Sequence, residues 1–353
     1  MTEIEKIPHN GYDVVSTFSG CGGSCLGYRM AGFRVLWASE FIPAAQEVYK
    51  MNHSDSLLDT RDIRDVEPEE ILKGTDRERG EIEILDGSPP CSDFSTAGKG
   101  SDGWGKVKEY SDTKQRVDDL FFEYARLLDG LQPKVFVAEN VRGLVRGKAK
   151  GYFKMILRQL KDCGYDVQAK VLDAQWLGVP QRRQRLIFVG VRKDLDAKPV
   201  HPDPLSYRYT IKDALPWLQS IEGANGFDGH EWYNSSQPMA TVQAQRAVKC
   251  EGLPIEDEAW IGQYAIGDEW NKLQQGEQSD KYFSLIRPDP NKPCPTVTQT
   301  GKTTGAASVT HPTEKRKFSI AELRRIQGFP DDFELAGSYA QRWERLARTV
   351  PPV

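Results

Sequence analysis

The chain has 353 residues, of which 39% are hydrophobic and 28% are charged, and its net charge is −4 at neutral pH. This length allows one large domain, or one domain with a smaller companion, and the apolar content is enough for a buried core. No apolar run approaches the roughly 18–20 residues of a membrane span and the first residues lack a signal-peptide core, so we expect a cytoplasmic protein.

Along the first half of the chain, short apolar runs typical of strands alternate with helical periods. Strands are predicted at residues 12–18, 34–39, 82–85, 135–139, 166–173 and 186–191. Residues 112–130 predict an amphipathic helix with one apolar face and an exit at Gly130. This alternation predicts an α/β fold with a mostly parallel sheet flanked by helices, which binds ligands at the carboxyl ends of its strands.

The pattern changes between residues 196 and 315, where prolines, glycines, amides and tryptophans replace the regular alternation. We expect a second, smaller and loop-rich domain there. Regular structure returns at residues 319–328, where Ser319 and Glu322 predict a capping box at the start of a helix. The expected domains are therefore residues 1–195 together with 316–353, and residues 196–315.

The first motif is a glycine-rich turn at residues 18–23, between a predicted strand and a helix. Glu40 follows about twenty residues later, at the end of the next strand. Glycines let the backbone approach a ligand, and a carboxylate can accept ribose hydroxyls. Because Cys25 stands where a dinucleotide motif has its third glycine, a single-nucleoside cofactor is favoured over NAD. An ordinary tight turn is the alternative.

The second motif is Pro89-Pro90-Cys91, directly after an apolar strand. Two prolines fix the backbone, so the thiol is presented at a rigid strand end. A lone cysteine of this kind is more commonly a buried structural residue than a nucleophile. The following residues 92–114 are small, polar and glycine-rich, which is typical of a mobile lid over a charged substrate.

The third and fourth motifs supply an acid and a pair of arginines. Glu139 ends the strand at 135–139 and could hydrogen-bond a ring nitrogen, although a capping or salt-bridged glutamate fits as well. At strand spacing Arg183 and Arg185 point to the same face, which suits anion binding. A solvated strand edge is the plainer interpretation of the two arginines.

Two further features bear on ligands. The six cysteines are too sparse for a disulfide scaffold, and no histidine or second cysteine pair completes a zinc site with Cys21 and Cys25, so we expect no metal. Basic residues concentrate at 182–193 and at 315–325. Either concentration could bind nucleic acid despite the net negative charge, and a solvated face is again the plainer interpretation.

Taken in order, these motifs closely resemble those of the DNA (cytosine-5) methyltransferase family over about residues 11–350. The resemblance covers the glycine turn, Glu40, the pair Asp62-Ile63, Pro90-Cys91, Glu139-Asn140-Val141, the segment 181–185 and the closing segment 316–350. It implies a Rossmann-like methyltransferase domain with a target recognition domain at 196–315. It also implies sequence-specific methyl transfer from S-adenosylmethionine to C5 of a cytosine flipped out of duplex DNA.

The resemblance implies a role for each catalytic residue. The Cys91 thiolate would attack C6, and Glu139 would hydrogen-bond N3 and the exocyclic amine. Arg185, with Arg183, would stabilise the intermediate. The cofactor-binding residues it implies are Phe18, Gly20, Cys21, Gly23, Glu40, Phe41, Asp62, Ile63, Pro89, Arg348 and Thr349. The expected DNA-contacting residues are Ser92, Ser95, Lys99, Gln243, Arg246, Thr298, Gln299 and Lys302.

The sequence departs from the family pattern at Ser92, where glutamine is usual, and at Ala347-Arg348, where a Gly-Asn pair is usual. The second departure leaves three interpretations: neutral drift, a weakened DNA-binding member, or an enzyme in which Arg348 selects a cofactor with an extra carboxylate. A tRNA methyltransferase is a further alternative, but the long stretch between Arg192 and Arg316 favours duplex DNA. We expect a monomeric enzyme of a restriction-modification system or a phage, for which a cognate restriction endonuclease would be the partner.

Overall fold

The computed structural model describes residues 1–90, 108–110, 113–115, 119–218 and 254–352. The chain divides into two compact units. The sheet unit comprises Glu3–Leu172 and Gln184–Pro202, and the C-terminal unit comprises Met1–Thr2, Asp173–Arg183 and Asp203–Val353.

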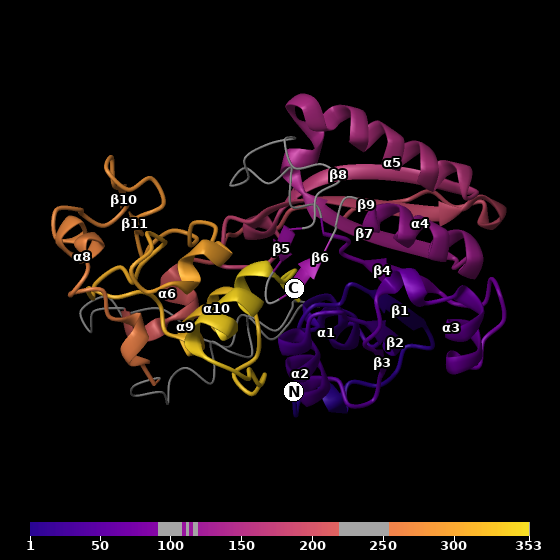
Figure 1. The fold of residues 1–353 in the computed structure, drawn as a ribbon, viewed down its shortest axis with the longest axis horizontal. Helices are drawn as coiled ribbons and strands as arrows, with labels where there is room; N and C mark the ends of the chain where they lie inside the picture. The colour runs from indigo at the N-terminus through magenta and orange to yellow at the C-terminus, as the bar shows by residue number, and fades with distance from the viewer. Residues whose placement is uncertain (91–107, 111–112, 116–118, 219–253, 353) are drawn as a thin grey trace. The chain divides into compact units, whose positions relative to one another are not determined.

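The sheet unit is built on a seven-stranded sheet with the order β3-β2-β1-β4-β7-β9-β8 (Figure 1). Its strands are β1 (Asp13–Thr17), β2 (Arg34–Ser39), β3 (Leu57–Asp59), β4 (Ile84–Gly87), β7 (Val135–Val141), β8 (Tyr165–Asp173) and β9 (Gln184–Arg192). The five strands from β3 to β7 pair in parallel, and β9 pairs with β7 in the antiparallel sense. The prediction of a mostly parallel α/β sheet is therefore confirmed.

Helices connect these strands, as parallel pairing requires. They are α1 (Gly23–Met30), α2 (Pro43–Asn52), α3 (Pro68–Thr75), α4 (Leu120–Leu131) and α5 (Lys150–Asp162). A short antiparallel hairpin of β5 (Lys108–Tyr110) and β6 (Thr113–Gln115) precedes α4. The predicted helix at 112–130 therefore started too early, because residues 113–115 pair as a strand.

The exit of α4 also differs from the prediction. The helix continues through Gly130 to Leu131, and Gln132 closes it in the left-handed conformation with φ of 50°. A Cβ on Gly130 would lie 2.3 Å from the Cγ of Pro68 at the start of α3. Gly130 is thus required by the close approach of two helices, not by the turn after α4.

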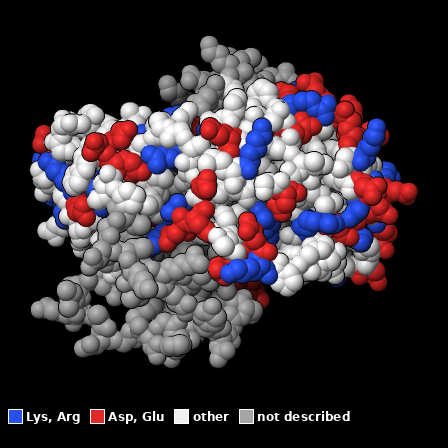
Figure 2. Space-filling view, turned by 90° about the horizontal axis from the view of Figure 1, so that it is seen from below, with Lys and Arg blue, Asp and Glu red and all other residues white. Residues whose placement is uncertain are grey.

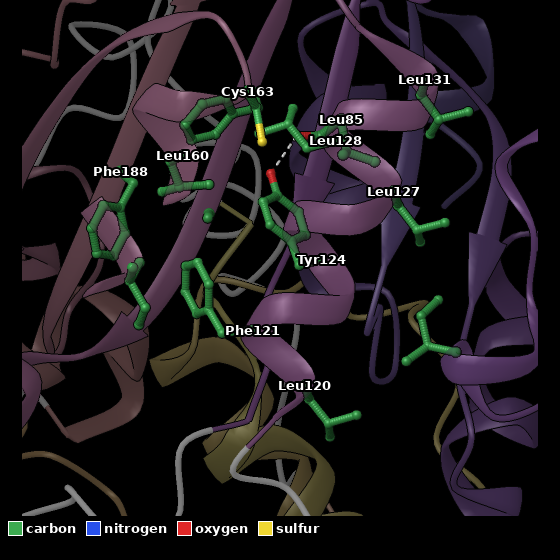
Figure 3. Packing of buried hydrophobic residues seen from close by; sticks show 14 of the residues in the cluster. Leu85, Leu120, Phe121, Tyr124, Leu127, Leu128, Leu131, Leu160, Cys163 and Phe188 are labelled. Carbon is green, nitrogen blue, oxygen red and sulfur yellow. Dashed lines mark hydrogen bonds between the residues drawn. The ribbon is translucent and has the colours of Figure 1, made fainter. Parts of the chain in front are cut away.

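The apolar face of α4 forms the centre of the core, as Figure 3 shows. Phe121 packs edge-on against Phe188 of β9, with ring centroids 5.7 Å apart. The Tyr124 hydroxyl donates to the carbonyls of Leu85 and Val137, at 3.1 and 3.2 Å. Full burial of each leucine or aromatic side chain contributes about 1.5–3 kcal/mol. The helix therefore holds together strands β4, β7 and β9, and of these β7 carries Glu139 and β9 carries Arg185.

The C-terminal unit is loop-rich, in keeping with the predicted texture of residues 196–315. Its regular elements are α6 (Ile211–Ala214), α8 (Ala265–Trp270), the hairpin β10 (Glu277–Gln278) with β11 (Ile286–Arg287), α9 (Ile320–Ile326) and α10 (Tyr339–Arg348). Ser319 and Glu322 cap α9 reciprocally, which confirms the predicted capping box. The closing residues 316–353 belong to this compact unit, and their functional assignment to the catalytic domain stays a prediction.

Several cations in the second basic concentration, residues 315–325, are buried. Arg316, Lys317 and Arg325 are each at most 1% exposed. Arg316 forms two hydrogen bonds to Glu322, at 2.7 and 2.8 Å, and Arg325 pairs with a nearby aspartate. On the described part of the face in Figure 2, basic and acidic side chains are intermixed. These three cations are therefore neither a solvated face nor a surface for nucleic acid.

Among the described residues, no helix is long and apolar enough to cross a membrane.

Candidate active site

The glycine turn after β1 has the backbone that the sequence predicted. Phe18, Gly20 and Gly22 have φ of 53°, 59° and 86°, so the chain turns through left-handed conformations that favour glycine. The N–H of Gly20 donates to one carboxylate oxygen of Glu40 at 2.7 Å, and the N–H of Ile42 donates to the other at 2.7 Å. Glu40 therefore fixes the turn against the end of β2.

The turn is open to a ligand at Gly20. A Cβ added there would meet no heavy atom within 4 Å, whereas a Cβ on Gly22 would overlap the ring of His53. A carboxylate oxygen can accept more than one hydrogen bond. These features fit a nucleoside that contacts the protein backbone at the turn and whose hydroxyls reach Glu40.

The other predicted cofactor residues follow the same edge of the sheet. Phe41, next to Glu40, is 38% exposed, whereas Cys21 and Ile63 are buried in the core. The Asp62 carboxylate accepts the N–H of Arg64 at 3.0 Å and pairs with its guanidinium at 2.9 Å. Because β1, β2 and β3 are adjacent and parallel, their carboxyl ends bring these segments to one edge.

Sequence reasoning missed Asp86, a buried carboxylate in β4. It accepts the hydroxyls of Ser16 of β1 at 2.9 Å and Ser24 of α1 at 2.7 Å, and more weakly that of Tyr28 at 3.4 Å. Burial raises the pKa of Asp86 to about 6, although these hydrogen bonds oppose the effect. The signal in the sequence is an acidic residue within an otherwise apolar strand.

The segment before Cys91 is fixed by Asn140 of β7. The Asn140 side-chain amide donates to the carbonyl of Pro89 at 3.2 Å, and Asn140 itself is only 2% exposed. Strands β4 and β7 are parallel neighbours, with Gly87 opposite Ala138, so Asn140 reaches the chain just beyond β4. Six of the predicted site residues lie outside the described ranges: Cys91, Ser92, Ser95, Lys99, Gln243 and Arg246.

Beside Asn140, Glu139 and Arg185 form an ion pair. The Arg185 Nε lies 2.6 Å from a Glu139 carboxylate oxygen, and the side chains are 20% and 16% exposed. The two residues come from the antiparallel neighbours β9 and β7, where Val141 lies opposite Arg185. Partial burial strengthens the pair, and the remaining exposure leaves both groups accessible to a ligand.

Arg183 does not share a strand face with Arg185, because β9 begins at Gln184. Its guanidinium is buried and donates to the carbonyls of Ala347 and Thr349, at 2.8 and 2.9 Å. The spacing argument that grouped the two arginines is therefore wrong. In this structure Arg183 secures the end of α10, and a catalytic role for it stays a prediction.

The predicted residues near the end of the chain are also anchored internally. The Nε of Arg348 donates to Glu344 at 2.7 Å, and the Nζ of Lys302 donates to the same carboxylate at 2.6 Å. The carbonyl of Thr298 accepts the indole N–H of Trp343 at 3.0 Å, while the Gln299 side chain is exposed. Within the described ranges, no three His, Cys, Asp or Glu residues are arranged to hold a metal ion.

The sequence of this chain is similar to those of known proteins over nearly its whole length. The sequence profile of the family described as C-5 cytosine-specific DNA methylase matches residues 12–353. The chain is 31% identical over 350 residues to the Type II methyltransferase M.NgoFVII of Neisseria gonorrhoeae, covering 96% of this chain and 83% of the relative. It is 30% identical to the Type II methyltransferase M.FnuDI of Fusobacterium nucleatum, with 96% and 90% covered.

Solved structures share the fold at lower identity. A prophage-encoded protein of E. coli has a TM-score of 0.70 at 24% identity, covering 97% of this chain and 95% of that one. A DNMT2 mutant of Spodoptera frugiperda has a TM-score of 0.65 at 17% identity, with 97% and 96% covered.

Proposed function

The chain belongs to the C-5 cytosine-specific DNA methylase family, and from this premise we propose that it methylates C5 of a flipped-out cytosine in duplex DNA through a covalent adduct of Cys91. The observation that carries the proposal is the Glu139–Arg185 pair of 2.6 Å at the strand ends where Asn140 fixes the segment leading to Cys91. A recognised base at that edge would meet a nucleophile, a carboxylate and a guanidinium together.

The glycine turn and Glu40 would hold the nucleoside portion of S-adenosylmethionine. When bound, this cofactor supplies a methyl group on a positively charged sulfur. The residues fit such a group, because the turn is open at Gly20 and Glu40 is already oriented by two backbone N–H groups. Phe41, exposed beside Glu40, is available to pack against the adenine ring of the cofactor.

Cys91 would act as the nucleophile on the base. Addition of its thiolate to C6 would push the C5–C6 π electrons to C5, which would form the bond to the methyl carbon as the methyl–sulfur bond breaks and its electron pair stays on the sulfur. Loss of the C5 proton to water would then leave the C5–H electron pair to re-form the C5–C6 double bond and expel the thiolate. Pro89 and Pro90 limit the backbone freedom ahead of Cys91, and Asn140 holds the Pro89 carbonyl.

Glu139 and Arg185 would orient the ring and stabilise its charge. A carboxylate at this position can accept a hydrogen bond from the exocyclic amine, and the Arg185 guanidinium can face the negative charge that builds up on the ring. Their ion pair fixes both side chains before substrate arrives. This preorganisation is how the side chains of the protein would lower the activation barrier of methyl transfer.

The names of the similar proteins support a substrate and a biological setting for this activity. Their names as Type II methyltransferases support duplex DNA as the partner and a restriction-modification system as the setting. Gln299 and Thr298 of the C-terminal unit are candidates for base contacts, since an amide can bond an adenine edge in two places.

The test incubates the protein with mixed-sequence duplex DNA and S-adenosylmethionine labelled with deuterium on the methyl group, beside Cys91→Ser and Glu139→Gln variants. The DNA is digested to nucleosides for mass analysis. Labelled 5-methylcytosine from the wild type and none from Cys91→Ser supports the proposal. A folded wild type that labels no cytosine in DNA overturns it, and label found only in transfer RNA in a parallel incubation identifies the other substrate.

A further inference from the structure

The segment 298–303, here the anchored loop, rests directly on helix α10. The Trp343 indole N–H donates to the carbonyl of Thr298 at 3.0 Å. A Cβ on Gly301 would lie 2.7 Å from the Trp343 ring, so the backbone at Gly301 packs directly against the indole. The loop contains a short 3-10 turn, Gln299–Lys302, whose inner side is thus covered by an aromatic surface.

A buried lysine holds the same loop from another side. The Nζ of Lys317 donates to the carbonyls of Gly301 and Thr303, at 2.7 and 2.5 Å. Burial lowers the pKa of Lys317 to about 7. A neutral amine still has two N–H groups for these two carbonyls, so the loop keeps both hydrogen bonds on either side of neutral pH.

The third attachment is a buried carboxylate, Glu344, whose side chain is 1% exposed. One of its oxygens lies 2.6 Å from the Lys302 Nζ and the other 2.7 Å from the Arg348 Nε. Burial raises the pKa of Glu344, but these cations and Arg345 outweigh that effect and hold it below its usual value. Glu344 is therefore ionised, and Arg348 is one of the cations that balance its charge.

These attachments leave some side chains of the anchored loop exposed and hold another inward. Lys302 is bound inward to Glu344, whereas Gln299, Thr300 and Thr303 are exposed. Amide and hydroxyl groups of this kind bond base edges. Held on three sides, the loop presents them with little conformational freedom to lose on binding.

We propose that Glu344 and Arg348 are positioning residues for DNA recognition: they fix Lys302 and the anchored loop so that Gln299 and Thr300 meet the edges of DNA bases. The proposal rests on the proposed methyltransferase function. It gives Arg348 a role other than the selection of a carboxylated cofactor, which was one of three interpretations of this position, and it starts from the bond of the Arg348 Nε to Glu344. Neither residue needs to touch DNA, since both act through the position of the loop.

The test compares Arg348→Gln, Glu344→Gln and Gly301→Ala with the wild type, after the recognised site has been mapped by sequencing methylated DNA. Gly301→Ala displaces the loop from Trp343 without changing any charge. Arg342→Gln is the matched control, since Arg342 lies on the same helix and pairs with Glu256 at 3.3 Å. For each variant we would measure the KM for DNA, the KM for S-adenosylmethionine, and the ratio of methylation at the recognised site to that at sites with one mismatch.

We expect the three variants to lose about tenfold in this ratio, the scale of one poorly read base pair. The KM for S-adenosylmethionine should stay within about twofold of the wild-type value, and Arg348→Lys should recover most of the ratio. A change in the KM for cofactor alone, with the ratio intact in Arg348→Gln and Gly301→Ala, overturns the inference. A wild type that methylates no DNA refutes the proposed function instead, so the two failures are distinguishable.

Discussion

Replacing Asp86 with asparagine should stabilise the protein above pH 6 and have little effect near pH 4. Burial raises the pKa of Asp86 from 3.8 to about 6 in the folded state. The folded protein therefore binds a proton more tightly than the unfolded chain does, and stability falls as pH rises from about 4 to 6. That pKa difference corresponds to a penalty of about 3 kcal/mol above pH 6.

The expected gain is smaller than this penalty. Ser16 and Ser24 donate to the same carboxylate oxygen, and an asparagine presents only one acceptor oxygen with an NH₂ group that needs a partner. If one of the hydroxyls around residue 86 turns so that it accepts a hydrogen bond from this NH₂ group, the change costs about 1 kcal/mol. Asp86→Asn should thus raise the free energy of unfolding by about 1–2 kcal/mol at pH 8.

The assay is urea denaturation followed by circular dichroism between pH 4 and pH 8. Asp13→Asn serves as a control of opposite sign. Burial raises the Asp13 pKa, but hydrogen bonds from Arg34 and Arg77 outweigh that effect and hold it below the usual value. Removing that carboxylate should destabilise the protein at pH 8. A difference between Asp86→Asn and wild type that is constant with pH would refute the reasoning.

Three further outcomes are expected, each read by thermal or urea denaturation. Gly190→Ala should cost about 1–3 kcal/mol, because its Cβ would lie 2.0 Å from the Phe136 ring. Gly151→Ala, in open space on α5, should stabilise the protein by about 0.5–1 kcal/mol, and equal effects of the two substitutions would contradict the packing argument. Arg183→Met should destabilise by about 2–4 kcal/mol by leaving two buried carbonyls without a donor, and a neutral result would show that the contact is dispensable. Tyr124→Phe should cost about 1 kcal/mol for its two carbonyl contacts, and an unchanged melting temperature would count against them.

The sequence could predict features whose cause is local. The left-handed turn at Gly20 and Gly22 follows from the freedom of glycine, and the cap at Ser319 and Glu322 follows from the unsatisfied N–H groups of any helix start. Strand positions follow from apolar runs, and the residues at the strand ends, such as Glu139, follow from them in turn. The motif order was enough to identify the family, since its motifs occur in sequence segments of a few residues each.

The tertiary structure decided which charged groups are buried and what holds them. Arg183 bonds the carbonyl of Ala347, 164 residues away, and Lys317 is enclosed by the anchored loop and Trp343. No local pattern distinguishes these cations from solvated ones, because the free energy that buries a charge comes from acceptors supplied by distant segments. The sequence by itself therefore determined the family, most of the sheet-forming segments and the chemical groups. Only the fold determined the order of the strands in the sheet, which arginines stay accessible and which become part of the framework.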